Sequence, residues 1–124
     1  MCIRDSLRTA DVCVNPDPPG PLNDISTMNK VVEYLATGNP VVQFDTVEGR
    51  YSAGEAAEYA APGPTGLAAA LEKLLRDPDR CHEMGRLARE RFRTQLAWER
   101  QVPALLAAHA RARAARHQRG RARA

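Results

Sequence analysis

The sequence has few of the features that most readily reveal a function. Its 124 residues contain no run of about 18 apolar residues, so we expect no membrane-spanning helix. Aromatic residues make up only 5% of the chain, so any core must be aliphatic and rich in alanine. The three cysteines, Cys2, Cys13 and Cys81, lack the spacing of metal ligands and are expected to be reduced thiols. No glycine-rich phosphate loop, nucleophile motif or secretory leader is visible, and the last absence makes the cytoplasm the expected location.

The basic charge of the chain is concentrated at its C-terminal end. Residues 110–124 contain six arginines and no acid, and subtracting these six charges from the formal total of +3 leaves −3 for the rest. We expect this tail to be frayed or disordered. Residues 1–6, MCIRDS, fit no later pattern and are interpreted as a non-native leader. The folded domain is therefore expected over residues 7–109.

The stretch from Ser26 to Asp45 organises the chain. Apolar residues recur there at helical spacing and are expected to face a core: Met28, Val31, Val32, Leu35 and Ala36. Ser26 is expected to cap this helix at its start, and Gly38 suits a left-handed cap at its end. Asn39-Pro40 prevents continuation, and Val41–Phe44 is typical of a short buried strand in a parallel sheet.

The segments on either side of this stretch complete an α/β pattern. Ala10–Val14 predicts a buried strand, and the proline-rich residues 17–21 predict an irregular loop before the central helix. The order strand, helix, strand is that of a βαβ unit with a right-handed crossover. Residues 45–58 are expected to form a loop, followed by a weak strand over residues 57–62.

Three helices are expected in the C-terminal half. Thr65 is expected to cap the first, and Asp77 with Pro78 the second. The third covers residues 96–117, where Pro103 should kink or break it. Its apolar stripe consists of Trp98, Val102, Leu105, Leu106 and His109.

Two groups of polar residues in the central stretch are candidates for ligand binding. Glu33 can accept hydrogen bonds from the two vicinal hydroxyls of a ribose, although a solvated ion pair with Lys30 explains the same spacing. The start of the helix, residues 25–30, offers free backbone N–H groups to an anion, with the hydroxyls of Ser26 and Thr27 nearby. A plain helix cap is the alternative explanation for this second group.

From Ala10 to about Ala108 the chain resembles the C-terminal part of a retaining glycosyltransferase of family 4, which has the GT-B fold. The resemblance rests on ADVCVNPDPPGPLNDISTMNKVVEYLATGNPVVQFD, EGRYSAGEAAEYAAP, LLRDPDRCHEMGRLARERF and LAWERQVPALL. Within that family it is strongest to polysaccharide-assembly enzymes that carry NDISTMNK before an EYxAxG element. It covers most of this chain but only part of a whole enzyme, and it is specific for the family rather than for a substrate.

The resemblance implies roles for the candidate residues. Glu33 matches the second glutamate of the family's E-x7-E element and would bind the ribose of a nucleotide-sugar. The first glutamate would fall at Ile25, where this sequence departs from the pattern, so the sugar contact must come from elsewhere, such as Asp24 or backbone N–H groups. The stretch facing the diphosphate and the sugar would comprise Asp24, Ile25, Ser26, Thr27, Met28, Asn29 and Lys30. The family's basic residues for the leaving phosphate would lie upstream of this chain, so no catalytic residue is assigned.

We therefore expect an α/β fold, the last part of a Rossmann-like domain followed by C-terminal helices. The expected function is transfer of a hexosyl group from a nucleotide-sugar to a glycan or lipid-linked acceptor, with retention and without a metal or other cofactor. A missing N-terminal acceptor domain would leave this chain alone inactive. The expected parent enzyme contacts the inner face of the membrane peripherally and binds no specific nucleic acid.

Two alternatives stay open. One is a nucleotide-sugar epimerase of GT-B shape. The other is a non-catalytic module whose basic tail binds nucleic acid or another acidic surface through salt-dependent phosphate contacts.

Overall fold

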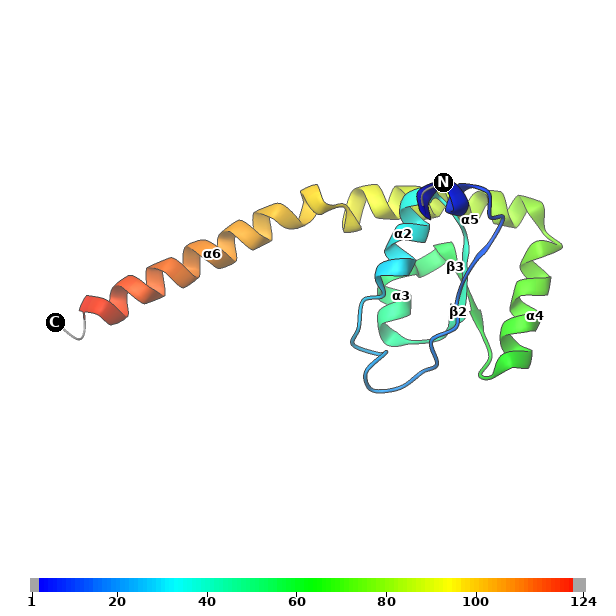
Figure 1. Ribbon diagram of the computed structural model, residues 1–124, viewed down its shortest axis with the longest axis horizontal. Coiled ribbons are helices and arrows are strands. Elements are labelled where there is room, and N and C mark those ends of the chain that lie inside the picture. Colours follow the sequence, from blue (N-terminus) through cyan, green and yellow to red (C-terminus); the bar gives the residue numbers. More distant parts are fainter. Residues whose placement is uncertain (1–2, 122–124) are drawn as a thin grey trace.

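A computed structural model of the protein describes residues 3–121, with side chains as far as Arg116. Its centre is a parallel sheet of three strands in the order β1-β2-β3, which Figure 1 shows beside the helices. The strands are β1 (Cys13–Asn15), β2 (Val41–Phe44) and β3 (Ala57–Ala60). The helical elements are α1 (Ile3–Arg8), α2 (Asn29–Thr37), α3 (Val47–Ala53), η1 (Gly54–Ala56), α4 (Pro64–Leu75), α5 (Pro78–Arg91), the π turn η2 (Phe92–Leu96) and α6 (Trp98–Arg121). The α/β class and all three predicted strands are thus confirmed.

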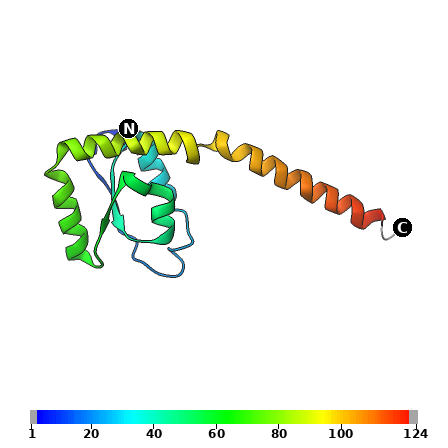
Figure 2. The same ribbon diagram turned by 180° about the vertical axis from the view of Figure 1, so that it is seen from behind.

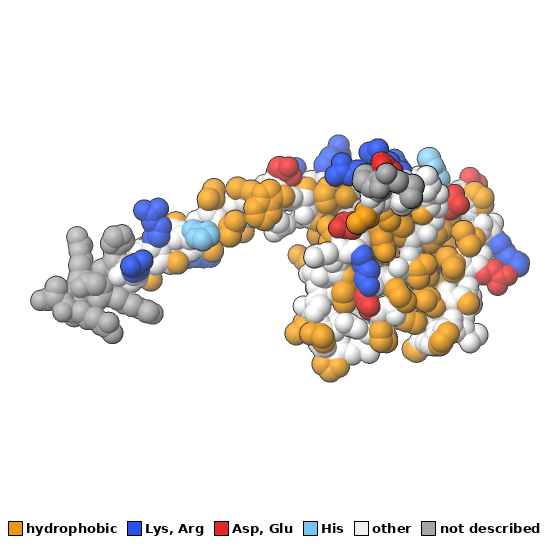
Figure 3. Space-filling model, in the orientation of Figure 1, with side chains coloured by type: hydrophobic (Ala, Val, Ile, Leu, Met, Phe, Trp, Pro, Cys, Tyr) orange, Lys and Arg blue, Asp and Glu red, His pale blue; other side chains and the backbone are white. Residues whose placement is uncertain are grey.

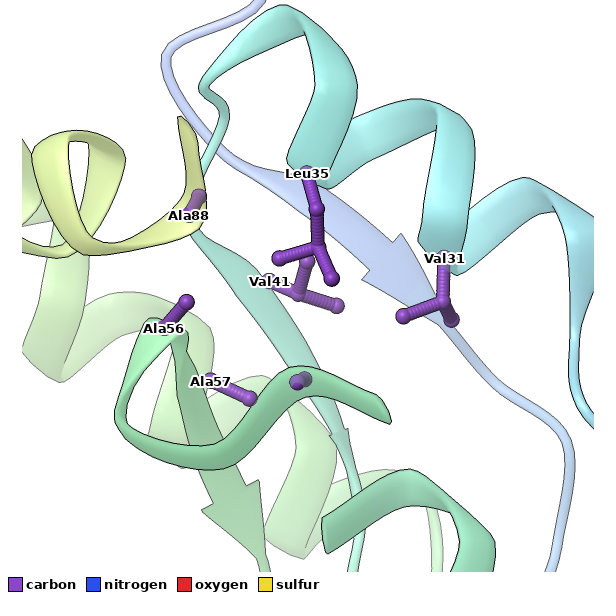
Figure 4. Close-up of a cluster of buried hydrophobic side chains, with 7 residues drawn as sticks. Val31, Leu35, Val41, Ala56, Ala57 and Ala88 are labelled. Atoms are coloured by element: carbon purple, nitrogen blue, oxygen red, sulfur yellow. The ribbon is translucent and has the colours of Figure 1, made fainter. Parts of the chain in front are cut away.

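The core has two parts, one on each face of the sheet. On one face, α2 packs Val31 and Leu35 against Val41 of β2, together with alanines of η1, β3 and α5, as Figure 4 shows. On the other face, Val42 and Phe44 of β2 meet Leu74 of α4. This division follows from the strand geometry, because successive side chains of β2 point to opposite faces. The sheet is therefore covered on both sides, as expected for parallel strands.

Helix α5 crosses the edge of the sheet at which the strands begin, and Figures 1 and 2 show it there from opposite sides. It contributes Ala88 to one core cluster and Met84 to the other. The crossing is close, because a Cβ on Gly85 would lie 2.6 Å from the carbonyl oxygen of Gly38. Helix α5 thus covers the amino edge, whereas the loop after β1 and the short helix α3 lie at the opposite, carboxyl edge.

The C-terminal end of α2 agrees with the sequence prediction and its start does not. Gly38 has φ of 80° and caps the helix in the left-handed conformation. The predicted Ser26 cap is wrong, because α2 begins at Asn29 and its capping residue is Met28, which makes no side-chain cap bond. The Ser26 hydroxyl instead donates to the carbonyl oxygen of Leu22 at 2.6 Å, closing a turn in the loop.

Two further predictions are corrected and one is confirmed. Residues 45–58 are not simply a loop, because Thr46 caps the short helix α3 by accepting the Gly49 N–H at 3.0 Å. Thr65 does not cap α4, whose N-cap is Gly63 at φ 90°, followed by Pro64 in the first turn. The predicted Asp77 cap is confirmed, since its carboxylate accepts the Arg80 N–H at 2.9 Å.

Helix α6 extends away from the rest of the protein (Figures 1 and 2). Pro103 lies inside it without breaking it, and the interruption before α6 falls instead at η2 and Ala97, whose ψ is 141°. The predicted apolar stripe is largely exposed, with Trp98 and Leu106 each 63% accessible, and orange side chains follow this helix in Figure 3. Residues 110–121, part of the expected tail, are helical. None of the helices within residues 3–121 is long and apolar enough to cross a membrane.

Candidate functional site

The candidate site lies at the carboxyl edge of the sheet, where β1 and β2 end. In open α/β sheets ligands bind beyond the carboxyl ends of the strands. The loop formed by residues 16–28 follows β1 there, and Figure 1 shows it extending past the end of the sheet. Beneath this loop is a hollow of about 10 Å³, whose polar lining includes Asn15, Asp17, Ser26, Gln43, Thr46 and Ser52. Side chains from both strand ends therefore converge with the loop that carries the predicted site.

Lys30 is bound to the loop rather than to Glu33. Its Nζ lies 2.6 Å from a carboxylate oxygen of Asp17, and the two side chains are 39% and 31% exposed. The ion pair between Lys30 and Glu33 considered from the sequence is therefore not formed. Glu33 is exposed on α2, one turn after Lys30, and does not line the hollow.

Hydrogen bonds hold the loop against α3. A carboxylate oxygen of Asp24 accepts the Val47 N–H at 3.2 Å. The Thr27 hydroxyl donates to Glu48 at 2.6 Å, and the Ser52 hydroxyl donates to the same oxygen at 3.0 Å. Asp24 and Thr27, both predicted site residues, therefore already have partners that position the loop.

The other predicted residues differ in their surroundings. Ile25 is 79% exposed, and Asn29 is exposed at the first position of α2. Met28 packs against the core cluster around Leu35. The N–H groups of Val31 and Val32 donate to the Met28 carbonyl at 2.9 and 3.3 Å. The first N–H groups of the helix, those of Asn29 and Lys30, are thus at its open end, where an anion is favoured.

Two buried amides at the strand ends were not predicted as site residues. Asn15 and Gln43 are adjacent in the register of β1 and β2 and are 6% and 0% exposed. The Asn15 Nδ2 donates to Gln43 Oε1 at 3.4 Å, and Gln43 Nε2 donates to the Gly49 carbonyl at 3.1 Å. Asn15 Oδ1 is buried and has no hydrogen-bond partner. The available sequence signal was a polar residue at the last position of β1 and at the last but one of β2, in two otherwise apolar strands.

A second set of polar contacts, among Asp45, Arg50 and Tyr59, lies just after β2 and beside the hollow. Arg50 donates two hydrogen bonds to Asp45, at 2.5 and 2.7 Å, and these lower the pKa of the Asp45 carboxyl. The Arg50 guanidinium lies 4.3 Å from the centroid of the Tyr59 ring, a cation–π distance. Burial raises the pKa of Tyr59, whose hydroxyl donates to the Gly54 carbonyl at 2.9 Å. These contacts tie β2, α3 and β3 together.

A larger cleft, of about 510 Å³, lies at the amino edge between α5 and the residues that precede β1 and β2. Its charged residues include Arg86 and Arg89. Arg86 pairs with Glu83 and Glu90, at 2.7 and 3.1 Å. Because Arg86 is already paired with acids and the cleft lies at the edge where the strands begin, we assign the candidate site to the carboxyl edge. Within residues 3–121 no group of three or more His, Cys, Asp or Glu side chains is placed to hold a metal.

Searches against protein-family models, curated proteins and solved structures found no match to this chain.

Proposed function

We propose that the protein is a nucleotide-sugar-binding α/β domain, and more particularly the donor-binding part of a retaining glycosyltransferase of family 4. The observation that carries this proposal is the position of the loop 16–28 and the open end of α2 together at the carboxyl edge of the parallel sheet. The sequence resemblance assigns the same segment to the nucleotide-sugar. In this proposal the chain contributes part of the binding site of a hexosyltransferase that acts in polysaccharide or glycan assembly.

Each part of the site has a chemical task in this proposal. The diphosphate binds at the N–H groups that begin α2, where the helix dipole favours negative charge. Lys30, the second residue of α2, releases Asp17 and pairs with a phosphate oxygen instead. Glu33 is free of Lys30 and exposed on the next turn, so its carboxylate is available to accept hydrogen bonds from both ribose hydroxyls. The sugar is then directed toward the strand ends.

Calorimetric titration of UDP and GDP into the full chain tests this proposal. Glu33→Gln keeps the shape of the side chain and removes its charge. Because hydrogen bonds to a charged group contribute about 1.5–3 kcal/mol, we expect affinity to fall by about ten- to a hundredfold. Glu99→Gln, which removes the same charge from exposed α6, is the matched control and should not change affinity. Equal dissociation constants for wild type and Glu33→Gln would remove Glu33 from the site, and no binding by wild type would contradict the function.

A nucleic-acid-binding module is the second candidate, and the geometry of α6 favours it specifically. Arg111, Arg113 and Arg116 are exposed. They lie on α6, which extends away from the sheet and its covering helices (Figure 1). Binding through such arginines would weaken steeply as salt is added. A salt titration of duplex DNA binding, with and without residues 110–124, distinguishes this function from nucleotide-sugar binding, which does not need the tail.

A further inference from the structure

The unpaired oxygen of Asn15 is the least satisfied polar group at the site. Asn15 is 6% exposed, and among the described residues its Oδ1 is the buried side-chain atom that has no hydrogen-bond partner. Such atoms are uncommon in folded proteins because a buried acceptor without a partner destabilises the fold. Asn15 lines the hollow under the loop 16–28, so this unsatisfied acceptor belongs to a residue of the candidate site.

The orientation of this amide follows from the hydrogen-bond network. The Gly49 carbonyl can only accept, so the Gln43 side chain must present its Nε2 to it, at 3.1 Å. Gln43 Oε1 then faces Asn15, which must present its own Nδ2, at 3.4 Å. Reversing either amide would place two acceptors together. The atom of Asn15 that is left without a partner is therefore the oxygen, and it requires a hydrogen-bond donor.

Three of the neighbouring donors, those of Ser26, Ser52 and Asn23, are already committed. Ser26 donates to the Leu22 carbonyl at 2.6 Å, and Ser52 donates to Glu48 at 3.0 Å. The Asn23 amide donates to the Pro18 carbonyl at 2.7 Å. A group from outside the chain can therefore donate the hydrogen bond that Asn15 Oδ1 lacks.

The size of the hollow restricts that group. A volume of about 10 Å³ accepts a single oxygen atom, either of one water molecule or of one hydroxyl of a larger ligand. Asp17 and Ser26, both partly exposed, line the same hollow, so it borders the surface on the side of the loop. A hydroxyl that projects from a ligand lying over α2 and this loop therefore has a matching acceptor.

We propose that Asn15 Oδ1 accepts a hydrogen bond from one hydroxyl of the sugar and is a specificity-determining contact for the sugar half of the nucleotide-sugar. This inference rests on the proposed function. It gives the sugar a hydrogen-bond partner in addition to Asp24, one oxygen of which already accepts from Val47.

The test compares nucleotides with and without a sugar, using the full chain. Dissociation constants are measured for UDP, UDP-glucose, GDP and GDP-mannose with wild type, Asn15→Leu and Asn15→Asp. Asn15→Leu has a similar shape but no acceptor, so we expect it to weaken the binding of at least one of the two nucleotide-sugars by about three- to tenfold. Its affinity for UDP and GDP should match that of wild type. Asn15→Asp retains an acceptor oxygen for the hydroxyl and should recover part of the loss in sugar binding, although its second oxygen stands opposite Gln43 Oε1 and should lower the stability of this variant.

The outcomes separate the two proposals. If wild type binds no nucleotide, the proposed function fails and this contact fails with it. If wild type binds both kinds of ligand and Asn15→Leu weakens neither nucleotide-sugar, or weakens all four ligands equally, only the Asn15 contact is overturned. The same conclusion follows if a structure of the complex shows a water molecule on Asn15 Oδ1 with no sugar hydroxyl in reach. The UDP and GDP titrations also report whether each variant has retained a working site.

Discussion

Two buried asparagines at opposite edges of the sheet should respond differently to the same substitution. Asn15 and Asn39 are each 6% exposed. The Asn39 amide donates to the carbonyls of Leu7 and Ala10, at 3.0 and 2.8 Å. Its Oδ1 accepts the hydroxyl of Thr37 at 2.5 Å. The Asn15 side chain makes one long hydrogen bond, from its Nδ2 to Gln43 Oε1 at 3.4 Å, and its Oδ1 has no partner.

The expected magnitudes follow from these partners. Asn39→Leu removes three hydrogen bonds, each of which contributes about 0.5–1.5 kcal/mol, so unfolding free energy should fall by about 2–4 kcal/mol. Asn15→Leu removes one unsatisfied acceptor, Asn15 Oδ1, and creates another, Gln43 Oε1. These two effects oppose each other, and the stability of Asn15→Leu should stay within about 1 kcal/mol of wild type.

Urea denaturation followed by circular dichroism measures both variants under identical conditions. A loss for Asn15→Leu as large as that for Asn39→Leu would mean that Asn15 has a strong partner in the folded protein, which would refute the reasoning. Stability near that of wild type, combined with loss of sugar binding, would mark Asn15 as a residue retained for its ligand rather than for the fold.

Four further outcomes are expected. Deletion of residues 112–124 should change unfolding free energy by less than about 0.5 kcal/mol, because the described side chains there are exposed; a loss of several kcal/mol in urea denaturation would mean that the tail docks. Asp17→Asn frees Lys30 from its ion pair and should strengthen UDP binding by up to about fivefold in calorimetry, in line with the 0.2–1 kcal/mol typical of exposed pairs, whereas weaker binding would show that Asp17 itself helps to hold the nucleotide. Burial raises the pKa of the Cys13 thiol and of the less buried Cys81 thiol. The contribution of these neutral thiols to stability is therefore complete below their unfolded pKa of about 8.5 and declines as pH rises above it. Iodoacetamide labelling followed by mass spectrometry should modify Cys81 before buried Cys13, and the reverse order would contradict the placement of β1 in the sheet.

The parts of the fold that were predictable from sequence depend on local signals. The stripe containing Val31 and Leu35 identified the buried face of α2, and Gly38 marked its end because a left-handed cap favours glycine. Asp77 before Pro78 identified the start of α5 for a similarly local reason.

The errors arose where a polar side chain had two possible partners. The Ser26 hydroxyl was expected to bind the first turn of the helix, but it binds the Leu22 carbonyl within the loop. The short helix α3 was missed because it holds a glycine and depends on the Thr46 cap and on contacts with α2 and β2. Sequence spacing alone does not fix which of these competing bonds forms.

The candidate site was partly predictable for the same reasons. Residues 24–30 were expected between the first strand and the central helix, and the structure has them in the loop after β1 and at the start of α2, because strand, loop and helix follow one another along the chain. The pair formed by Lys30 and Asp17 and the network of Asn15 with Gln43 were not predicted. Both join segments distant in sequence, and only the register of β1 on β2 brings the two amides together.

The central claim is that a nucleotide-sugar binds at the carboxyl edge of the sheet. It is tested most directly by recording ¹H–¹⁵N correlation spectra of the full chain during titration with UDP-glucose and GDP-mannose. The account predicts that the shifted amide signals belong to residues 15–33 and 43–49, with those of Asn29 and Lys30 among the most affected. Shifts confined to the amino-edge cleft around Gly38 and Gly85, or to α6, or no shifts with either ligand, would contradict it.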